Sequence, residues 1–211
     1  MHIKTITAGP IETNAFVVGD ESSSEAIIID APPDSADRVL DAVRDDGFSV
    51  SLLVLTHAHF DHVIDAARIK QETGTPLAIH EDAMVQLRQV IQDGQAPYSV
   101  EDIGPDRYLK EGDEIAIGTL RFRVLNTPGH APGQISLYEE SEQVMFGGDT
   151  LFPGGYGRAD LPGSSMGETR ESMRKLLELP DSVTVYPGHG LPAQIGNERD
   201  WMTEFVESRG D

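Results

Sequence analysis

The sequence predicts an α/β fold of the α+β type, a four-layer αββα sandwich of two mixed, mostly antiparallel sheets between two layers of helices. Both halves of the chain contain apolar segments of strand length, and both contain amphipathic helical segments. The breaks between them are single Gly or Pro turns, without linkers or low-complexity stretches. With 211 residues, we expect one domain over residues 1–211.

Strands and helices alternate in the first half of the chain. A helix is expected from about Ser35 to Arg44, where the apolar residues share one face, and a second at Val63–Glu72, stopped by Gly74. A third helix is expected at Asp82–Gln92. The strands expected in this half are Ile3–Thr7, Ala15–Val18, Ala26–Ile29, Ser51–Leu55 and Pro76–Ile79.

The second half is richer in strands. In Leu120–Leu125, Arg121 and Arg123 alternate with apolar residues, the period of a half-buried strand. A helix should begin after Ser165, because Glu168 completes a capping box. Its predicted inward stripe is Met166, Met173, Leu176 and Leu177. The other expected elements are strands at Glu114–Ile117, Gln134–Tyr138, Val144–Phe146 and Val183–Tyr186, and a helix at Asn197–Ser208.

The chain is strongly acidic, with 36 Asp and Glu against 16 Lys and Arg and a net charge of −20. Such a field repels nucleic acids and anionic membranes, so we expect neither as a partner. An acidic, Lys-poor surface is also what a salt-adapted cytoplasm selects, because molar salt screens the self-repulsion. A halophilic source is therefore a hypothesis, which a melting temperature that does not rise between low and molar KCl would contradict.

No segment is typical of targeting or membrane insertion. The longest apolar runs, such as Ala26–Ile29, fall short of the roughly 18 residues that a membrane span needs. The first residues are typical of a strand rather than of a signal peptide, so we expect a cytoplasmic protein. Cysteine is absent, which leaves histidine and carboxylate as the ligands for any metal ion.

A cluster of candidate metal ligands follows the apolar segment Ser51–Leu55. It reads Thr56-His57-Ala58-His59-Phe60-Asp61-His62, with three imidazoles and one carboxylate within six residues. A chance occurrence of this H-x-H-x-D-H pattern has odds on the order of one in a thousand, so the pattern indicates a metal site. Asp61 is also suited to cap the helix predicted after it.

Three further candidates repeat one local pattern, in which an apolar strand is followed by a Gly-containing turn and then by a ligand. They are His130, Asp149 and His189. Because sheets carry their sites on loops at strand ends, we expect four segments to converge on one site. Asp30 has the same context, but we favour a turn or supporting role for it, and we expect His80 to be structural.

Five motifs, taken in order along the chain, carry a resemblance to a known family. They are Thr56–His62, Thr127-Pro128-Gly129-His130-x-Pro132-Gly133, Gly148–Phe152, Gly157-Arg158-x-Asp160 and Tyr186–Gly190. Over essentially its whole length the chain resembles the metallo-β-lactamase superfamily, and within it the short glyoxalase II-like (hydroxyacylglutathione hydrolase-like) hydrolases. The αββα sandwich of that family agrees with the fold predicted above.

The resemblance implies two divalent metal ions, zinc first, with iron and manganese as alternatives. It implies that one ion is held by His57, His59 and His130, and the other by Asp61, His62 and His189, with Asp149 bridging the two. Two ions about 3.5–4 Å apart lower the pKa of a shared water, so that a bridging hydroxide can attack an acyl carbon at neutral pH. Asp61 and Asp149 are therefore the candidate catalytic residues, and a thioester is the expected substrate because a thiolate leaves without a strong acid.

Substrate recognition is implied for two more residues. Arg158 and Tyr186 occupy positions that contact the thiol carrier in the family, although Arg158 is equally suited to pair with Asp160 in its own loop. We expect the protein to lack the C-terminal helical domain with which longer members complete glutathione binding. The expected substrate is thus a small acyl-thiol, carried by glutathione or by another low-molecular-weight thiol.

Two other classes of function stay open. Persulfide dioxygenases of the same superfamily resemble this motif set but use one iron, which would make the protein an oxidoreductase. A metal-binding module without catalytic activity is the second alternative. The β-lactam and tRNA-processing branches are disfavoured, because the chain lacks a Cys ligand and a basic surface.

Overall fold

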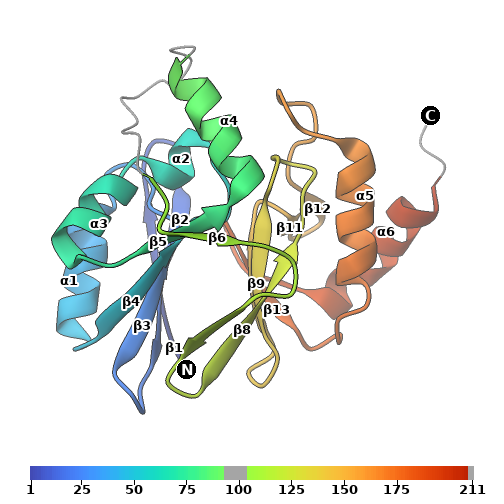
Figure 1. Ribbon diagram of the computed structural model, residues 1–211. Coiled ribbons are helices and arrows are strands. Elements are labelled where there is room, and N and C mark those ends of the chain that lie inside the picture. Colours follow the sequence, from blue (N-terminus) through green and yellow to red (C-terminus); the bar gives the residue numbers. More distant parts are fainter. Residues whose placement is uncertain (93–103, 209–211) are drawn as a thin grey trace.

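The computed structural model describes residues 1–92 and 104–208. In these residues, two six-stranded sheets pack face to face and helices cover both outer faces (Figure 1). The predicted four-layer αββα sandwich is therefore confirmed. Within the described ranges, no helix combines the length and the apolar character that crossing a bilayer would require.

The first sheet has the strand order β1-β2-β3-β4-β5-β6. Its first three strands are antiparallel, but from β3 to β6 each strand is parallel to its neighbour, because helices lead the chain back between them. The prediction of mixed sheets holds, with more parallel pairing here than expected. The strands are β1 (His2–Ala8), β2 (Thr13–Asp20), β3 (Glu25–Ile29), β4 (Ser49–Val54), β5 (Leu77–His80) and β6 (Arg107–Leu109).

The second sheet has the order β14-β13-β10-β9-β8-β7, and only its β10–β13 pair is parallel. A separate hairpin of two short strands, β11 (Leu151–Phe152) and β12 (Gly155–Tyr156), follows β10. Sequence patterns did not predict this hairpin, β6 or β14. The strands of the sheet are β7 (Glu114–Ile117), β8 (Leu120–Asn126), β9 (Ile135–Glu139), β10 (Val144–Gly148), β13 (Thr184–Pro187) and β14 (Ala193–Gln194).

Helices α1 to α4 lie on the side of the first sheet, and α5 and α6 lie on the side of the second (Figure 1). The single helix expected at Val63–Glu72 is two helices, α2 and α3, with Asp65 between them. The Asp65 carboxylate accepts hydrogen bonds of 2.8 Å from the backbone N–H groups of Ser35 and Ala36, at the start of α1. The helices are α1 (Ala36–Asp45), α2 (Phe60–Val63), α3 (Ala66–Thr73), α4 (Glu81–Gln92), α5 (Met166–Leu176) and α6 (Ile195–Glu207).

The apolar core has three layers, one between the sheets and one under each helix layer. In β8, the alternation is confirmed, because Phe122 is fully buried while Arg121 and Arg123 are exposed. The predicted inward stripe of α5 is wrong at Met166, which is 43% exposed. The first turn of α5 lies beyond the apolar cluster that Met173 and the later turns cover.

Candidate metal centre

The seven candidate ligands meet at one end of the sandwich, where strands of both sheets end. His57 and His59 follow β4, and Asp61 and His62 lie on α2; the other three follow β8, β10 and β13. A backbone bridge between Thr13 and His189 joins the two sheets at this point. The structure thus brings together all seven residues that the sequence singled out.

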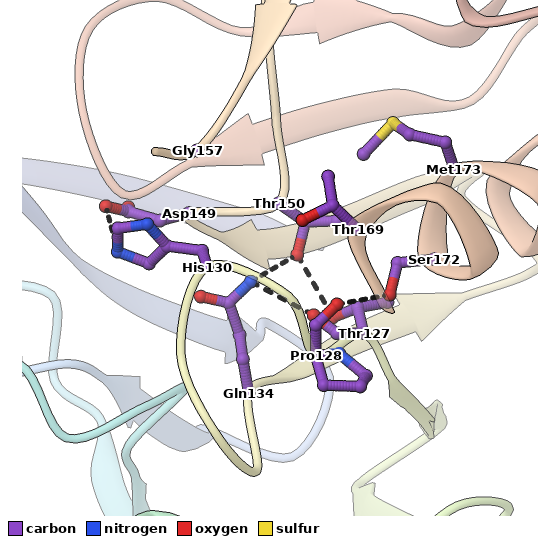
Figure 2. Close-up of a pocket in the computed structure, with 10 residues that line it drawn as sticks. All are labelled: Thr127, Pro128, His130, Gln134, Asp149, Thr150, Gly157, Thr169, Ser172 and Met173. Carbon is purple, nitrogen blue, oxygen red and sulfur yellow. Dashed lines mark hydrogen bonds and ion pairs between the residues drawn. The ribbon is translucent and has the colours of Figure 1, made fainter. Parts of the chain in front are cut away.

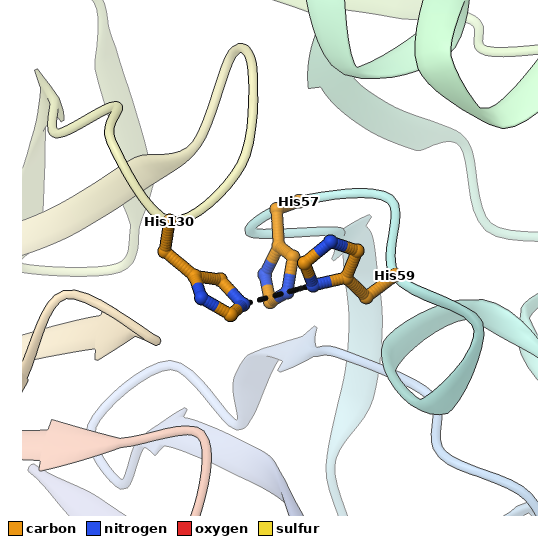
Figure 3. A group of neighbouring side chains, drawn as sticks. All are labelled: His57, His59 and His130. Atoms are coloured by element: carbon orange, nitrogen blue, oxygen red, sulfur yellow. Dashed lines mark hydrogen bonds between the residues drawn. The ribbon is translucent and has the colours of Figure 1, made fainter. Parts of the chain in front are cut away.

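His57, His59 and His130 form what we call the three-imidazole group. The Nδ1 atom of His59 lies 3.2 Å from His57 Nε2 and 2.8 Å from His130 Nε2, and the rings turn toward one another (Figure 3). Burial, reinforced by neighbouring imidazoles, lowers the pKa of His59 to about 3 and that of His57 well below its ordinary value. Burial also lowers the pKa of His130. The group therefore consists of neutral imidazoles, the form that binds metal ions.

Asp61, His62 and His189 form the carboxylate group. One oxygen of Asp61 lies 3.3 Å from His62 Nε2 and 3.2 Å from His189 Nε2. Burial opposes ionisation of Asp61, but the imidazoles of His189 and His62 beside its carboxylate outweigh burial and hold its pKa well below the usual range. Asp61 lies within α2 and not at its N-cap, which is His59, so the capping alternative is not realised.

Asp149 contacts both groups. Its carboxylate oxygens lie 3.3 Å from His130 Nε2, 3.5 Å from His189 Nε2 and 3.6 Å from His62 Nε2. Ligand atoms of His57, His62 and Asp149 also lie within 4.8 Å of one another. This position between the two groups is what a bridging ligand requires.

Asp30 orients two of the imidazoles from below. One of its oxygens accepts hydrogen bonds of 2.8 Å from His62 Nδ1 and from the hydroxyl of Thr56, and Thr56 in turn lies 3.1 Å from His57 Nδ1. Since the Thr56 hydroxyl donates to Asp30, it accepts the Nδ1 proton of His57. The protons of both rings are thus held on Nδ1, which leaves their Nε2 lone pairs for the site. This is the supporting role that the sequence favoured for Asp30.

Backbone carbonyls orient two other imidazoles in the same way. His130 Nδ1 donates to the carbonyl oxygen of Arg158 at 2.9 Å, and His189 Nδ1 donates to that of Ile11 at 3.0 Å. In the neutral form of each ring, Nε2 therefore carries a lone pair that faces the site. Burial disfavours a charge on His189, but the carboxylates of Asp61 and Asp149 outweigh burial and raise the pKa of its imidazole. His80, in contrast, accepts a hydrogen bond from the backbone of Asp82 and lies outside both groups, as expected for a structural residue.

A buried polar network holds the loops of His130 and Asp149 together (Figure 2). Gln134 Nε2 donates to the Thr150 hydroxyl at 2.8 Å, and the Thr150 hydroxyl lies 3.0 Å from that of Thr127. Because Thr127 and Thr150 flank the two ligands in sequence, this network positions both turns. The carboxylate of Asp149 and the ring of His130 lie to one side of it.

The donor set can be tested for its fit to metal ions. His62 Nε2 and Asp149 Oδ1 are buried and have no hydrogen-bond partner, a costly arrangement unless another group satisfies them. In the three-imidazole group, the Nε2 atoms of His57 and His130 both lie within hydrogen-bonding distance of His59 Nδ1, which can donate to only one of them at a time, and a cation would satisfy all three nitrogens. Imidazole and carboxylate donors suit zinc, iron and manganese. The residues present therefore fit two divalent ions.

Gly188 sets how closely the chain approaches this site. A Cβ atom at position 188 would lie 2.2 Å from Asp149 Oδ1 and 2.6 Å from Cε1 of His62. Neither side chain can move aside without leaving its ligand position. Only glycine leaves room for the carboxylate between the two groups.

An open cleft of about 830 Å³ lies over the ligands. His59, Asp61, His130, Asp149 and His189 line its floor. Arg158 lines the cleft, and its guanidinium is paired with Asp160 at 2.9 and 3.1 Å, the alternative that the sequence offered. Its substrate-binding role stays a prediction.

Tyr186 is placed elsewhere than its expected substrate-binding role suggests. Its ring stacks on Phe146 and meets Phe16 edge-on in the layer between the sheets, and it is not among the residues that line the cleft. The tyrosine that does line the cleft is Tyr156, on the β11–β12 hairpin. Strands of two residues carry no periodic signal, and for this reason the sequence did not identify it.

The comparisons with known proteins agree with this geometry. The family model described as the metallo-beta-lactamase superfamily matches residues 8–189. A protein of Aquifex aeolicus is 43% identical over 202 residues, with 94% of each chain covered. The hydroxyacylglutathione hydrolase GloC of Haemophilus influenzae is 31% identical over 204 residues, which cover 94% of this chain and 95% of the relative.

Three solved structures share the fold over nearly the whole chain. The BLEG-1 B3 metallo-beta-lactamase has a TM-score of 0.85 at 31% identity, covering 98% of this chain and 100% of its own. ETHE1 from Myxococcus xanthus has a TM-score of 0.80 at 25% identity, covering 99% and 86%. TTHA1623, in a di-iron-bound form, has a TM-score of 0.79 at 31% identity, covering 93% and 97%.

Proposed function

Because this chain belongs to the metallo-beta-lactamase superfamily, we propose that it is a two-metal thioester hydrolase that acts on an S-acyl low-molecular-weight thiol. One observation carries the proposal. The three-imidazole group and the carboxylate group share Asp149, and two buried ligand atoms, Asp149 Oδ1 and His62 Nε2, have no hydrogen-bond partner. Both groups lie on the floor of a cleft that admits a small molecule.

Two divalent ions bound there, zinc first with iron or manganese as alternatives, would supply an activated water near neutral pH and a Lewis acid for the acyl carbonyl. Asp61 stays ionised, because His189 and His62 lower its pKa, so its carboxylate accepts hydrogen bonds and orients a nucleophile. The Thr13 hydroxyl holds this carboxylate in place at 2.8 Å. Asp149 aligns the two ligand groups. A thioester suits such a site, since a thiolate leaves without a proton from an acid.

The known proteins support the proposal at the level of chemistry. A relative described as a hydroxyacylglutathione hydrolase covers nearly the whole chain at 31% identity. A structural neighbour of equal identity is described as di-iron-bound. Both descriptions fit a hydrolase with two metal ions.

Two other activities have a specific observation in their favour. The similarity to ETHE1 keeps a mononuclear iron persulfide dioxygenase as the alternative, and the similarity to BLEG-1 adds β-lactam hydrolysis. The complete carboxylate group favours a second ion over a single iron, because Asp61, His62 and His189 offer three converging ligand atoms. Metal stoichiometry separates the first alternative from the proposal.

The test combines metal content with activity on the same sample. We expect about two ions of zinc, iron or manganese per chain, together with hydrolysis of S-lactoylglutathione or of a simpler thioester. One iron per chain with oxygen uptake on a persulfide would overturn the proposal in favour of the oxidoreductase. Two ions with turnover of a chromogenic cephalosporin but of no thioester would assign the site to β-lactams. Two ions with no turnover of any of these would leave a metal-binding module.

A further inference from the structure

Apolar side chains form the walls of the cleft above the ligands. The ring of Phe152 lies 6.4 Å from that of His189, centroid to centroid, so the apolar wall begins beside a candidate ligand. On the other strand of the hairpin, Tyr156 also lines the cleft. The other apolar residues that line the cleft are Ile11, Ala58, Phe60, Leu161 and Pro162.

The charges of the cleft are unsuited to a substrate with several carboxylates. Arg158 is the only Lys or Arg side chain among the described residues that line it, and both of its contacts go to Asp160. With a net charge of −20 on the whole chain, a second substrate carboxylate would find no free cation in this lining.

The hairpin wall is held rigidly by α6. The buried carboxylate of Glu198 accepts a hydrogen bond of 2.7 Å from the backbone N–H of Gly154 at the hairpin turn, and one of 2.6 Å from Trp201 Nε1. The Tyr156 ring packs on Phe205, with centroids 4.6 Å apart, and lies 6.3 Å from that of Trp201. A wall fixed before binding does not pay an ordering cost when a ligand packs against it.

From these three observations we infer the substrate class, an inference that rests on the proposed function. The cleft selects thioesters that carry an apolar group next to the reacting carbonyl and no more than one carboxylate. The apolar group packs against Phe152 and Tyr156. Lactoylglutathione, with a hydroxylated acyl group and two carboxylates on its carrier, is by this inference a poor substrate.

A two-by-two set of thioesters tests the inference. Phenylacetyl and lactoyl groups are each attached to N-acetylcysteamine and to glutathione, and each kcat/KM is divided by the rate constant for hydrolysis in hydroxide alone. On either carrier we expect this normalised kcat/KM to be about 10-fold or more higher for the phenylacetyl thioester than for the lactoyl thioester, the ratio that burial of one apolar group typically gives. For either acyl group, we expect the normalised kcat/KM of the N-acetylcysteamine thioester to exceed that of the glutathione thioester. The lactoyl thioester of benzyl mercaptan shows whether the apolar group can also lie on the thiol side.

Variants test whether the hairpin wall is responsible. Tyr156→Ala should bring the phenylacetyl-to-lactoyl ratio close to one, chiefly through a higher KM for the phenylacetyl substrate. Ile11→Ala, at a 49% exposed position, tests the opposite wall with little risk to folding. The matched control is Tyr108→Ala, on β6, which removes a 46% exposed tyrosine that does not line the cleft and should leave the ratio unchanged.

Binding can be measured without turnover, because Trp201 is the single tryptophan of the chain and lies beside the wall. We expect the thioether S-phenethyl-N-acetylcysteamine to change the Trp201 fluorescence with saturation, and S-methylglutathione at equal concentration to leave it unchanged. Equal responses to the two probes would overturn the inference, as would a preference for lactoylglutathione in the kinetic set.

The inference and the proposed function fail in different ways. Thioester hydrolysis that is fastest on lactoylglutathione would keep the proposed function and overturn the inferred substrate class. Saturable binding of the thioether with hydrolysis of none of the five thioesters would overturn the proposed function and keep the selectivity of the cleft.

Discussion

Strand β2 meets a buried carboxylate at each of its ends, one among the candidate metal ligands and the other among backbone and hydroxyl donors. At its start, Thr13 donates to Asp61 in the carboxylate group. At its end, Asp20 accepts four hydrogen bonds, two from Ser22 and two from Thr119, and so ties this end of the first sheet to the β7–β8 turn of the second. Asp20 is 5% exposed, as is Asp61.

The difference teaches how to distinguish a structural carboxylate from a functional one. The oxygens of Asp20 are surrounded by donors, and these hydrogen bonds hold its pKa well below the usual range. At the other end of the sandwich, Asp149 has a buried oxygen with no partner, amid imidazoles whose protons are held elsewhere. A buried carboxylate whose oxygens all accept hydrogen bonds stabilises the fold. Buried oxygen and nitrogen atoms that face one another without enough hydrogen-bond donors indicate a site for a cation.

Removing Asp149 should have the largest effect. Asp149→Ala is expected to lose at least one of the two metal ions and to lower kcat roughly 10³-fold or more, since both ligand groups lose their shared member. Metal analysis by mass spectrometry and thioester kinetics measure the two losses. Asp20→Asn is the control, and it should keep both ions and its kcat. Full activity in Asp149→Ala would remove this residue from the mechanism.

Changing Asp30 should weaken metal binding without removing a ligand. In Asp30→Asn, the protons on Nδ1 of His57 and His62 are less firmly held, so zinc affinity should fall about 10–100-fold. Competition with a chromophoric chelator measures it. Asp34→Asn is a matched control, because Asp34 shares the left-handed backbone of Asp30, with φ of 62° against 60°, but is exposed. Equal affinities of the two variants would contradict the orienting role.

Adding zinc to the metal-free protein should stabilise it. At a free concentration about 100 times Kd, binding to the folded state contributes about 2.7 kcal/mol, which raises Tm by roughly 5–10 °C for a chain of this size. Differential scanning calorimetry with and without chelator measures the shift. Asp20→Asn should show the same rise in Tm on addition of zinc, and Asp149→Ala should show a smaller rise. A larger rise in Asp149→Ala than in Asp20→Asn would contradict the roles assigned to these two carboxylates.

Replacing Asp20 should change how the stability of the folded protein depends on pH, and it should not change metal binding. Because its pKa is lowered in the folded state, its contribution to stability is present above the unfolded pKa of about 3.9 and is lost as the pH falls through the lower folded value. Asp20→Asn should therefore melt a few degrees below the unchanged protein at pH 7, and the difference should shrink below about pH 4. Melting curves of the metal-free proteins across this range measure it. A difference that grows on acidification would show that Asp20 acts otherwise.

The convergence of the seven candidate ligands could be predicted from the sequence because each one has a local signal. His130, Asp149 and His189 each follow an apolar strand and a Gly-containing turn, and the strand ends alone decide where they point. The sandwich was predictable for the same reason, since strand and helix periods are local properties.

The cleft walls could not be predicted, because they depend on distant contacts. Tyr156 lies on a strand of two residues, and its place is set by Phe205 and Glu198, more than 40 positions away in the chain. The family pattern suggested Tyr186, whose ring the structure places between the sheets. The break between α2 and α3 was missed for a similar reason, because Asp65 caps a helix that begins 29 residues earlier.

The close approach of Gly188 has a consequence for sequence variation among relatives of this chain. A methyl group there would collide with Asp149 and His62 whatever substrate the enzyme takes, whereas Phe152, Tyr156 and Ile11 line the cleft that the substrate enters. In an alignment of related sequences, position 188 should therefore stay glycine across branches with different substrates, while the wall positions diverge between branches.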